Sequence, residues 1–171
     1  MSTHAFPLRE EAGALVNASP LVLFELLDDH RRLSAHMEKS SWMMLGSRME
    51  LRLDAGGGRA VGSRIRLAGR VLGLPLAVEE AVIERTPPSR KVWETLGTPR
   101  LLVIGPYRMG FETAPAGERS RLRVFIEYEL PRGPARVLGW LLGPPYARWC
   151  VLRMLNDAAR SFPAYGAAAF S

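Results

Sequence analysis

The sequence predicts an α+β fold in which one antiparallel sheet of about seven strands is covered by a long carboxyl-terminal helix. Two changes of hydrophobic period carry this prediction. From residue 47 to 131 apolar and polar residues alternate with a period of two, and from 132 to 162 apolar residues recur at helical spacing. A strand with a helix start behind it precedes both regions and adds the seventh strand.

The amino-terminal strand is predicted over "EEAGALVN" (10–17). Ser19 and Pro20 then supply an N-cap and a proline at the first helical position. The stretch 21–27 carries six large apolar side chains in seven positions, too many for a surface helix with one narrow apolar stripe. We therefore expect this helix to be buried on most sides, and 28–37 to form a second short helical turn.

Six further strands follow, separated by turn residues. They are predicted over 48–55, 62–73, 74–86, 91–97, 101–114 and 120–130. Connections this short exclude parallel pairing, so the strands should form an antiparallel meander. Alternation gives the sheet a dry face and a wet face. The wet face of the last strand would carry Arg121, Arg123, Glu127 and Glu129 together with Phe125.

The carboxyl-terminal helix is predicted to break at Gly143-Pro144-Pro145, because proline can open a helix but disrupts its interior. Beyond Tyr146 one helical face is apolar. It comprises Ala147, Cys150, Val151, Met154, Leu155, Ala158, Ser161 and Phe162. The dry face of the sheet is the only large apolar surface left for it to cover, so the helix should lie across that face.

Length and composition predict a single domain over 1–171, with loose ends at 1–9 and 164–171. The single cysteine cannot form an internal disulfide, and His4, His30 and His36 have no metal-ligand spacing. We expect no cofactor. With no signal peptide and no apolar stretch of membrane-spanning length, the expected location is the cytoplasm.

The formal net charge is +6, which raises the question of nucleic-acid binding. The basic residues are nearly all arginines and are spread along the chain among acidic residues, as on a solvated sheet face. We therefore expect no nucleic-acid partner. The glycines at 56–58 do not form a phosphate loop, because no lysine followed by serine or threonine stands at the required spacing.

The order of elements, together with "VNASPLVLFELLDD" (16–29) and "RMLNDAARSF" (153–162), resembles the START-related superfamily, also called SRPBCC. The resemblance is to its bacterial polyketide cyclase/dehydrase and coenzyme Q-binding members. It implies a helix-grip fold, in which a bent sheet grips the last helix and the short helices plug the remaining gap. It also implies an internal cavity for a hydrophobic small molecule, such as a lipid, polyketide or quinone. It carries no catalytic residues onto this chain.

The cavity would be lined from the dry face of the sheet and from the inward face of the last helix. The expected lining residues are Ile65, Leu67, Glu80, Tyr107, Met109, Phe111, Tyr128, Ala147, Val151, Met154 and Ala158. Two alternatives stay open for these positions. The tyrosine hydroxyls either orient a ligand carbonyl or act as a general acid, or they are ordinary core groups that reach the rim. Small residues, with Gly69 and Gly105 added, either leave volume for a ligand or permit close packing.

Glu79 and Glu80 stand side by side in a strand, so one of them must face the dry side. Register selects Glu80, whose pKa burial would raise and which could then act as a base. A bulge or a paired arginine would explain the position equally well. His36 would lie near the cavity mouth, but without a partnered carboxylate or nucleophile it favours rim packing over catalysis.

Trp140, Tyr146 and Trp149 flank the proline pair and could form an exposed aromatic patch for a membrane surface or a protein partner. Burial against the same domain is the alternative. Three functions therefore follow from the sequence: a carrier of a hydrophobic molecule, an aromatase/cyclase or dehydratase enzyme that uses Tyr107, Tyr128 or Glu80, and a docking adaptor.

Overall fold

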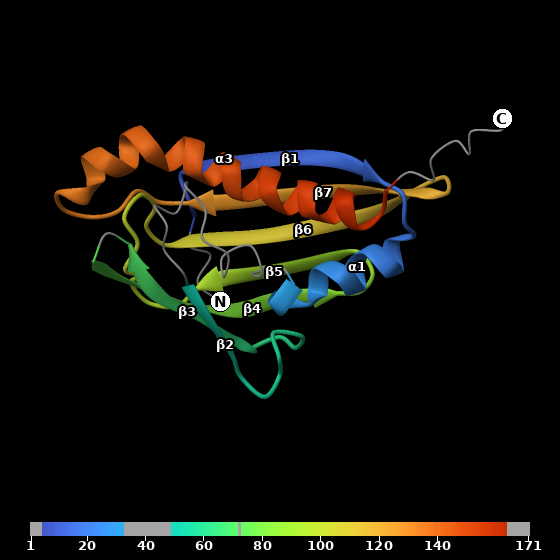
Figure 1. Ribbon diagram of the computed structural model, residues 1–171, viewed down its shortest axis with the longest axis horizontal. Helices are drawn as coiled ribbons and strands as arrows, with labels where there is room; N and C mark the ends of the chain where they lie inside the picture. Colours follow the sequence, from blue (N-terminus) through green and yellow to red (C-terminus); the bar gives the residue numbers. More distant parts are fainter. Residues whose placement is uncertain (1–4, 33–48, 72, 164–171) are drawn as a thin grey trace.

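The computed structural model describes residues 5–32, 49–71 and 73–163 and contains one antiparallel sheet covered by helices (Figure 1). The sheet has seven strands in the order β1-β7-β6-β5-β4-β3-β2. The strands are β1 (Leu8–Val16), β2 (Met49–Leu53), β3 (Arg64–Val71), β4 (Leu74–Thr86), β5 (Arg90–Thr95), β6 (Tyr107–Ala116) and β7 (Arg119–Tyr128). The helices with defined bounds are α1 (Pro20–Asp28) and α3 (Ala135–Ser161). The predicted α+β class and the antiparallel meander are confirmed.

Strand β1 completes the sheet by pairing with the last strand, β7, in a register that places Leu8 opposite Tyr128. The meander from β2 to β7 therefore begins at one edge and ends beside the amino-terminal strand. A bulge between Val82 and Glu84 shifts the register of β4 against β5. Bulges bend a strand and increase its twist, so this one contributes to the curvature around the space that α3 covers.

Helix α3 lies across β1 and β7, as Figure 1 shows. Its buried residues beyond the proline pair are Ala147, Val151, Met154, Leu155 and Ala158, all on the face that helical spacing predicts. The prediction that one long carboxyl-terminal helix packs on the dry face is confirmed. This packing puts the inward face of α3 opposite the inward side chains of β6 and β7.

The predicted break at Gly143-Pro144-Pro145 is wrong, because α3 runs without interruption through both prolines. The prolines remove two backbone donors, whose usual acceptors are the carbonyls of Trp140 and Leu141. Both residues are exposed, so water can bond those carbonyls. Gly143 holds the helix close to the protein, since a Cβ there would lie 3.0 Å from the carbonyl oxygen of Val103.

The strand predicted over 101–114 begins only at Tyr107. Residues 101–106 form a connection instead, held where Gly105 N donates to the Glu129 carbonyl and Glu129 N donates to the Pro106 carbonyl. Pro106 has no backbone donor for a ladder. Gly105 fits only without a side chain, because a Cβ would lie 2.8 Å from the Leu130 carbonyl oxygen. The apolar run before Tyr107 therefore belongs to a tight connection.

Helix α1 buries Leu23, Phe24 and Leu27, but Leu21 and Val22 are exposed. The prediction that this helix is buried on most sides is therefore wrong for its first turn. The helix packs against β6, β7 and α3, and a single turn of helix can direct only part of its circumference toward them. Helical structure resumes at residues 30–32, and the rest of the predicted second helix lies outside the described residues.

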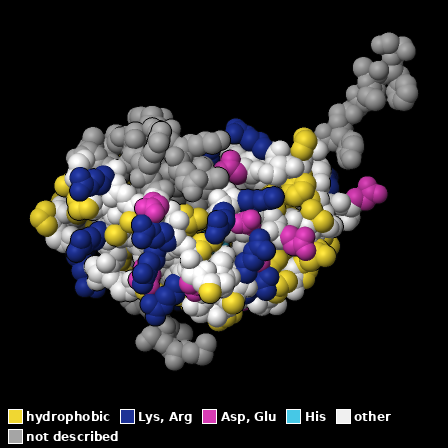
Figure 2. All heavy atoms as spheres, turned by 60° about the horizontal axis from the view of Figure 1, so that its bottom comes forward, with side chains coloured by type: hydrophobic (Ala, Val, Ile, Leu, Met, Phe, Trp, Pro, Cys, Tyr) yellow, Lys and Arg dark blue, Asp and Glu magenta, His cyan; other side chains and the backbone are white. Residues whose placement is uncertain are grey.

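The outer face of the sheet carries charges of both signs. Figure 2, which brings the β2 to β4 side forward, shows basic and acidic side chains interspersed, and Glu79 pairs there with Arg64 and Arg66. Phe125 faces the same side of the sheet but is buried, because the guanidinium groups of Arg9 and Arg90 lie over its ring at 5.1 and 5.3 Å. The described part of this face therefore shows charge pairing.

Candidate functional site

The concave side of the sheet holds a buried carboxyl group, that of Glu80. Strand alternation turns Glu80 inward and Glu79 outward, and only 3% of Glu80 is exposed. Glu80 lies in regular register with Ile65 on β3 and Thr95 on β5, before the bulge in β4 begins. The alternative explanation by a bulge therefore does not apply to this position.

The partners of Glu80 are an indole on the adjacent strand β5 and a phenol hydroxyl one strand further away, on β6. The Tyr107 hydroxyl on β6 donates a hydrogen bond to Glu80 Oε1, and the side chain of Trp93 on β5 also bonds this carboxyl group. Burial raises the pKa of Glu80 to about 7, and the two hydrogen bonds reduce that rise. Glu80 can therefore take up and release a proton near neutral pH.

A second polar pair stands beside this group on α3. The side chains of Tyr146 and Cys150 are hydrogen-bonded to each other, and burial raises the pKa of Cys150 to about 12. The pKa of Tyr107 lies well above its usual value because of burial first and the nearby Glu80 carboxylate second. Both hydroxyls and the thiol are therefore protonated near neutral pH and can act as hydrogen-bond donors.

The remaining predicted lining residues are inward residues of the sheet and of α3. Ile65, Leu67, Phe111 and Tyr128 on the sheet, and Ala147, Val151, Met154 and Ala158 on α3, are buried, while Met109 is partly buried. Tyr107 and Tyr128 are direct cross-strand neighbours. Burial and the charge of Glu10 on β1 raise the pKa of Tyr128. The structure thus brings the Tyr107 hydroxyl to Glu80, whereas the carboxylate that affects the Tyr128 phenol is that of Glu10.

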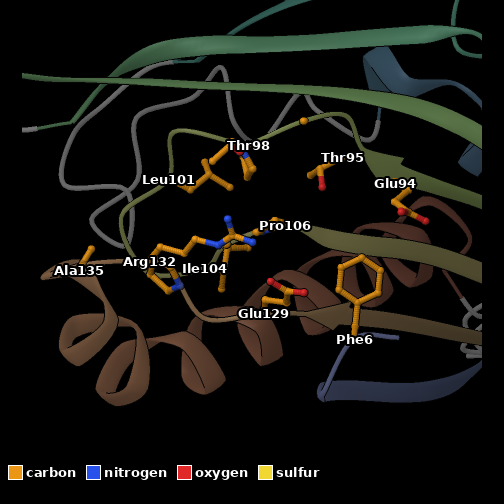
Figure 3. A pocket seen from close by; sticks show the side chains of 14 residues that line it. Phe6, Glu94, Thr95, Thr98, Leu101, Ile104, Pro106, Glu129, Arg132 and Ala135 are labelled. Atoms are coloured by element: carbon orange, nitrogen blue, oxygen red, sulfur yellow. The ribbon is translucent and has the colours of Figure 1, made fainter. Parts of the chain in front are cut away.

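A surface cleft of about 390 Å³ lies where β5 ends and β6 begins (Figure 3). It is lined by the β5 to β6 connection, the segment that leads from β7 into α3, and Phe6. Figure 3 shows the side chain of Arg132 reaching toward Pro106, with Glu129 nearby. Thr95 lines the cleft, and its Oγ1 accepts a hydrogen bond of 3.1 Å from Tyr107 N. Thr95 therefore connects the cleft to the pair formed by Glu80 and Tyr107.

A buried ionic network ties α1 to the sheet next to this site, and sequence reasoning missed it. Lys91 on β5 is fully buried, and its Nζ donates to the Asp28 carbonyl (2.9 Å), to Asp28 Oδ1 (2.7 Å) and to His30 Nδ1 (3.1 Å). Arg85 also binds the Asp28 carboxylate. Alternation from Trp93 would have placed Lys91 inward, but nothing local indicates that Asp28 meets it.

The network sets the state of His30. A lysine ammonium has only donors, so His30 Nδ1 accepts and Nε2 carries the proton. Burial, together with the nearby Lys91 charge, lowers the pKa of His30 to about 3, which keeps the ring neutral. Gly58 permits this packing, because a Cβ there would lie 2.9 Å from His30 Nδ1. The ring meets Trp93 edge-on with centroids 5.0 Å apart, which connects the network to the Glu80 group.

The predicted aromatic patch near the prolines divides in two. Trp140 is exposed, whereas Tyr146 and Trp149 are partly buried, stack at 6.0 Å and pack against the core. His36 lies outside the described residues. Within the described ranges, no three histidine, cysteine or acidic side chains gather as metal ligands, and no helix has the length and apolarity to cross a bilayer.

No family model and no curated protein matches the chain. Several solved structures match the chain. Protein TTHA0849 from Thermus thermophilus is 18% identical, with a TM-score of 0.66 over 90% of this chain and 95% of that chain. Protein CV1439 from Chromobacterium violaceum is 16% identical, with a TM-score of 0.62 over 92% and 99%. The norcoclaurine synthase of Thalictrum flavum, in complex with dopamine and hydroxybenzaldehyde, is 14% identical, with a TM-score of 0.63 over 90% and 84%.

The chain has the helix-grip fold. Its structural matches lie among the Bet v1-like and SRPBCC proteins, so the fold that the sequence resemblance implied is confirmed. At these identities the likeness concerns the fold. The helix-grip arrangement explains why Glu80 and Tyr107 face α3, because the bent sheet directs its concave side chains toward the gripped helix.

Proposed function

We propose that this helix-grip chain, acting as one domain, binds a hydrophobic small molecule between the bent sheet and α3, beside Glu80 and Tyr107. The observation that carries the proposal is a buried carboxyl group in apolar surroundings, bonded to a phenol and an indole. A protonated carboxyl offers one donor and one acceptor. Few polar groups among apolar walls are typical of small-molecule sites, and this set suits an apolar or aromatic body that carries a carbonyl or hydroxyl.

The cleft where β5 ends and β6 begins offers a place for the polar end of such a molecule. Its volume of about 390 Å³ is within the range of small-molecule pockets. Arg132, Glu129 and Thr95 provide charge and hydrogen bonds there, whereas Leu101 and Ile104 provide apolar surface. Because Thr95 bonds Tyr107, a ligand seated in the cleft would lie next to the buried pair.

The matched synthase supports the ligand class. Its complex contains dopamine and hydroxybenzaldehyde, two small aromatic molecules with oxygen functions. For this chain we propose a ligand of the same broad class, an apolar or aromatic molecule with oxygen functions. A lipid, a polyketide and a quinone all belong to this class. The cytoplasmic location inferred from the absence of a signal peptide and of an apolar stretch of membrane-spanning length stays a prediction.

Binding of the anionic dye 8-anilinonaphthalene-1-sulfonate is expected to weaken by about tenfold from about pH 6 to about pH 8. The reason is that Glu80 ionises near pH 7 and then repels the sulfonate. Glu80→Gln should remove this dependence. Tyr107→Phe should move its midpoint to higher pH, because the Tyr107 hydrogen bond holds the pKa of Glu80 down. Fluorescence titration with the dye at each pH measures the affinity of the wild type and of the two variants.

Glu79→Gln is the matched control, since Glu79 is the neighbouring residue on the opposite face and pairs with Arg64 and Arg66. It should keep the pH dependence of the wild type. Equal pH dependence in Glu80→Gln and Glu79→Gln would remove Glu80 from the binding site.

Catalysis is a second candidate, favoured by the pKa of Glu80. A general acid or base works best when its pKa lies near the operating pH, and the Glu80 value of about 7 meets that condition. In this case Tyr107 would orient a substrate carbonyl while Glu80 moves a proton, as in an aromatase/cyclase or a dehydratase. A carrier and an enzyme differ in whether the bound molecule is released changed.

A further inference from the structure

The first half of α3 carries exposed apolar side chains on the side turned away from the sheet. Val137, Trp140 and Leu141 are 75%, 71% and 65% exposed. Figure 1 shows these first turns of α3, in orange, extending past the amino-terminal end of β1. The apolar patch, as we call it, consists of Val137, Leu138, Trp140, Leu141, Leu142 and Pro145.

The opposite side of the same turns is buried. Gly139 and Gly143 face the protein, where a Cβ would lie 3.1 and 3.0 Å from the Val103 carbonyl oxygen. Leu138, Leu141 and Pro145 recur at spacings of three and four on the outer side. From residue 137 to 147 α3 therefore carries no charged side chain on any side, which in water is unusual for a helix that has only one side covered.

Basic residues flank the apolar patch. Arg132, Arg136 and Arg148 are exposed, and the sequence has no acidic residue between Glu129 and Asp157. Arg148 lies 4.0 Å from Glu10 at the β1 side. Trp, Leu and Val beside arginines, on a helix at the surface, are typical of segments that lie in the interface of an anionic bilayer.

We propose that the first half of α3 docks on an anionic lipid bilayer, with the apolar patch in the interface and the flanking arginines at the phosphates. A second copy of this chain is the less suitable occupant, because a symmetric contact would bring like-charged arginines together. The docked face adjoins the cleft, which Arg132 and Ala135 line. Docking would therefore place the cleft beside the membrane surface.

Flotation with lipid vesicles tests this proposal without any knowledge of the ligand. The protein should bind vesicles of phosphatidylcholine mixed with phosphatidylglycerol, and bind phosphatidylcholine alone by about tenfold less. Trp140→Ser with Leu141→Ser, and separately Arg132→Gln with Arg136→Gln, should each weaken binding by about tenfold or more. Added salt should also weaken the binding of the wild type to the anionic vesicles.

The control variants are Val61→Ser, an exposed apolar residue elsewhere, and Arg119→Gln with Arg121→Gln, exposed on β7. They should bind like the wild type. All substituted side chains are exposed, so circular dichroism and the urea midpoint should show folded variants. Absence of binding to either vesicle, or equal binding by patch and control variants, would overturn the proposal. So would a concentration-dependent dimer that Trp140→Ser with Leu141→Ser abolishes, since it would assign the patch to a second copy.

Discussion

Replacing Lys91 by methionine is expected to lower the free energy of unfolding by about 3–5 kcal/mol, the usual cost of removing one partner of a buried ion pair. Lys91 is fully buried, and all three of its ammonium hydrogens are used by Asp28 and His30. The substitution leaves the Asp28 carbonyl without this donor at the end of α1. Urea unfolding followed by circular dichroism measures the loss.

Arg52→Met is the matched control, because Arg52 is an exposed cation whose partner, Glu50, is also exposed. Its effect should stay within about 0.5 kcal/mol. Adding Asp28→Asn to Lys91→Met should cost less than the two single losses combined, because the buried carboxylate is then no longer charged. Equal urea midpoints for Lys91→Met and Arg52→Met would contradict the role of Lys91 as an anchor of α1.

The second large effect concerns Glu80 and the pH dependence of stability. Its pKa is about 7 in the folded chain against 4.5 for the ordinary side chain. Between these values the folded state keeps a proton that the unfolded state releases, so stability falls as the pH rises. The wild type should lose on the order of 3 kcal/mol between about pH 4.5 and about pH 8. Glu80→Gln should lack this loss.

The comparison is made by urea unfolding of both proteins at about pH 5 and about pH 8, with Glu79→Gln as control. The pKa of Glu79 is lowered, so its titration falls below this window and the control should follow the wild type. Parallel curves for the wild type and Glu80→Gln would show that Glu80 is not held protonated by burial.

The sequence pattern predicted the inward side chains of the sheet because a period of two leaves a strand only two choices. Glu80 and Tyr107 were assigned to one face in this way, and the structure adds that they are bonded to each other. The bounds of β4 were predicted without error, since turn residues flank it on both sides. At Leu101 to Pro106 the pattern failed, because an apolar run can equally serve as a tightly packed connection.

Features that depend on tertiary structure could not be predicted. Lys91 and Asp28 are 63 residues apart, and only the docking of α1 on the sheet brings them together. The sequence pattern likewise does not show that α3 continues through Pro144, or that Gly139 and Gly143 lie against the Val103 carbonyl. Exposure at Leu21 and Val22 likewise depends on how α1 is seated, which its own composition does not determine.

The measurement that tests the central claim most directly is native and denaturing mass spectrometry of the protein purified from its own host. The account predicts a folded mass that exceeds the chain mass by one reproducible small apolar compound, released on denaturation. It also predicts that Glu80→Gln with Tyr107→Phe retains less of this compound than Glu79→Gln. A folded mass equal to the chain mass in repeated preparations, together with no dye binding, would contradict a ligand site between the sheet and α3.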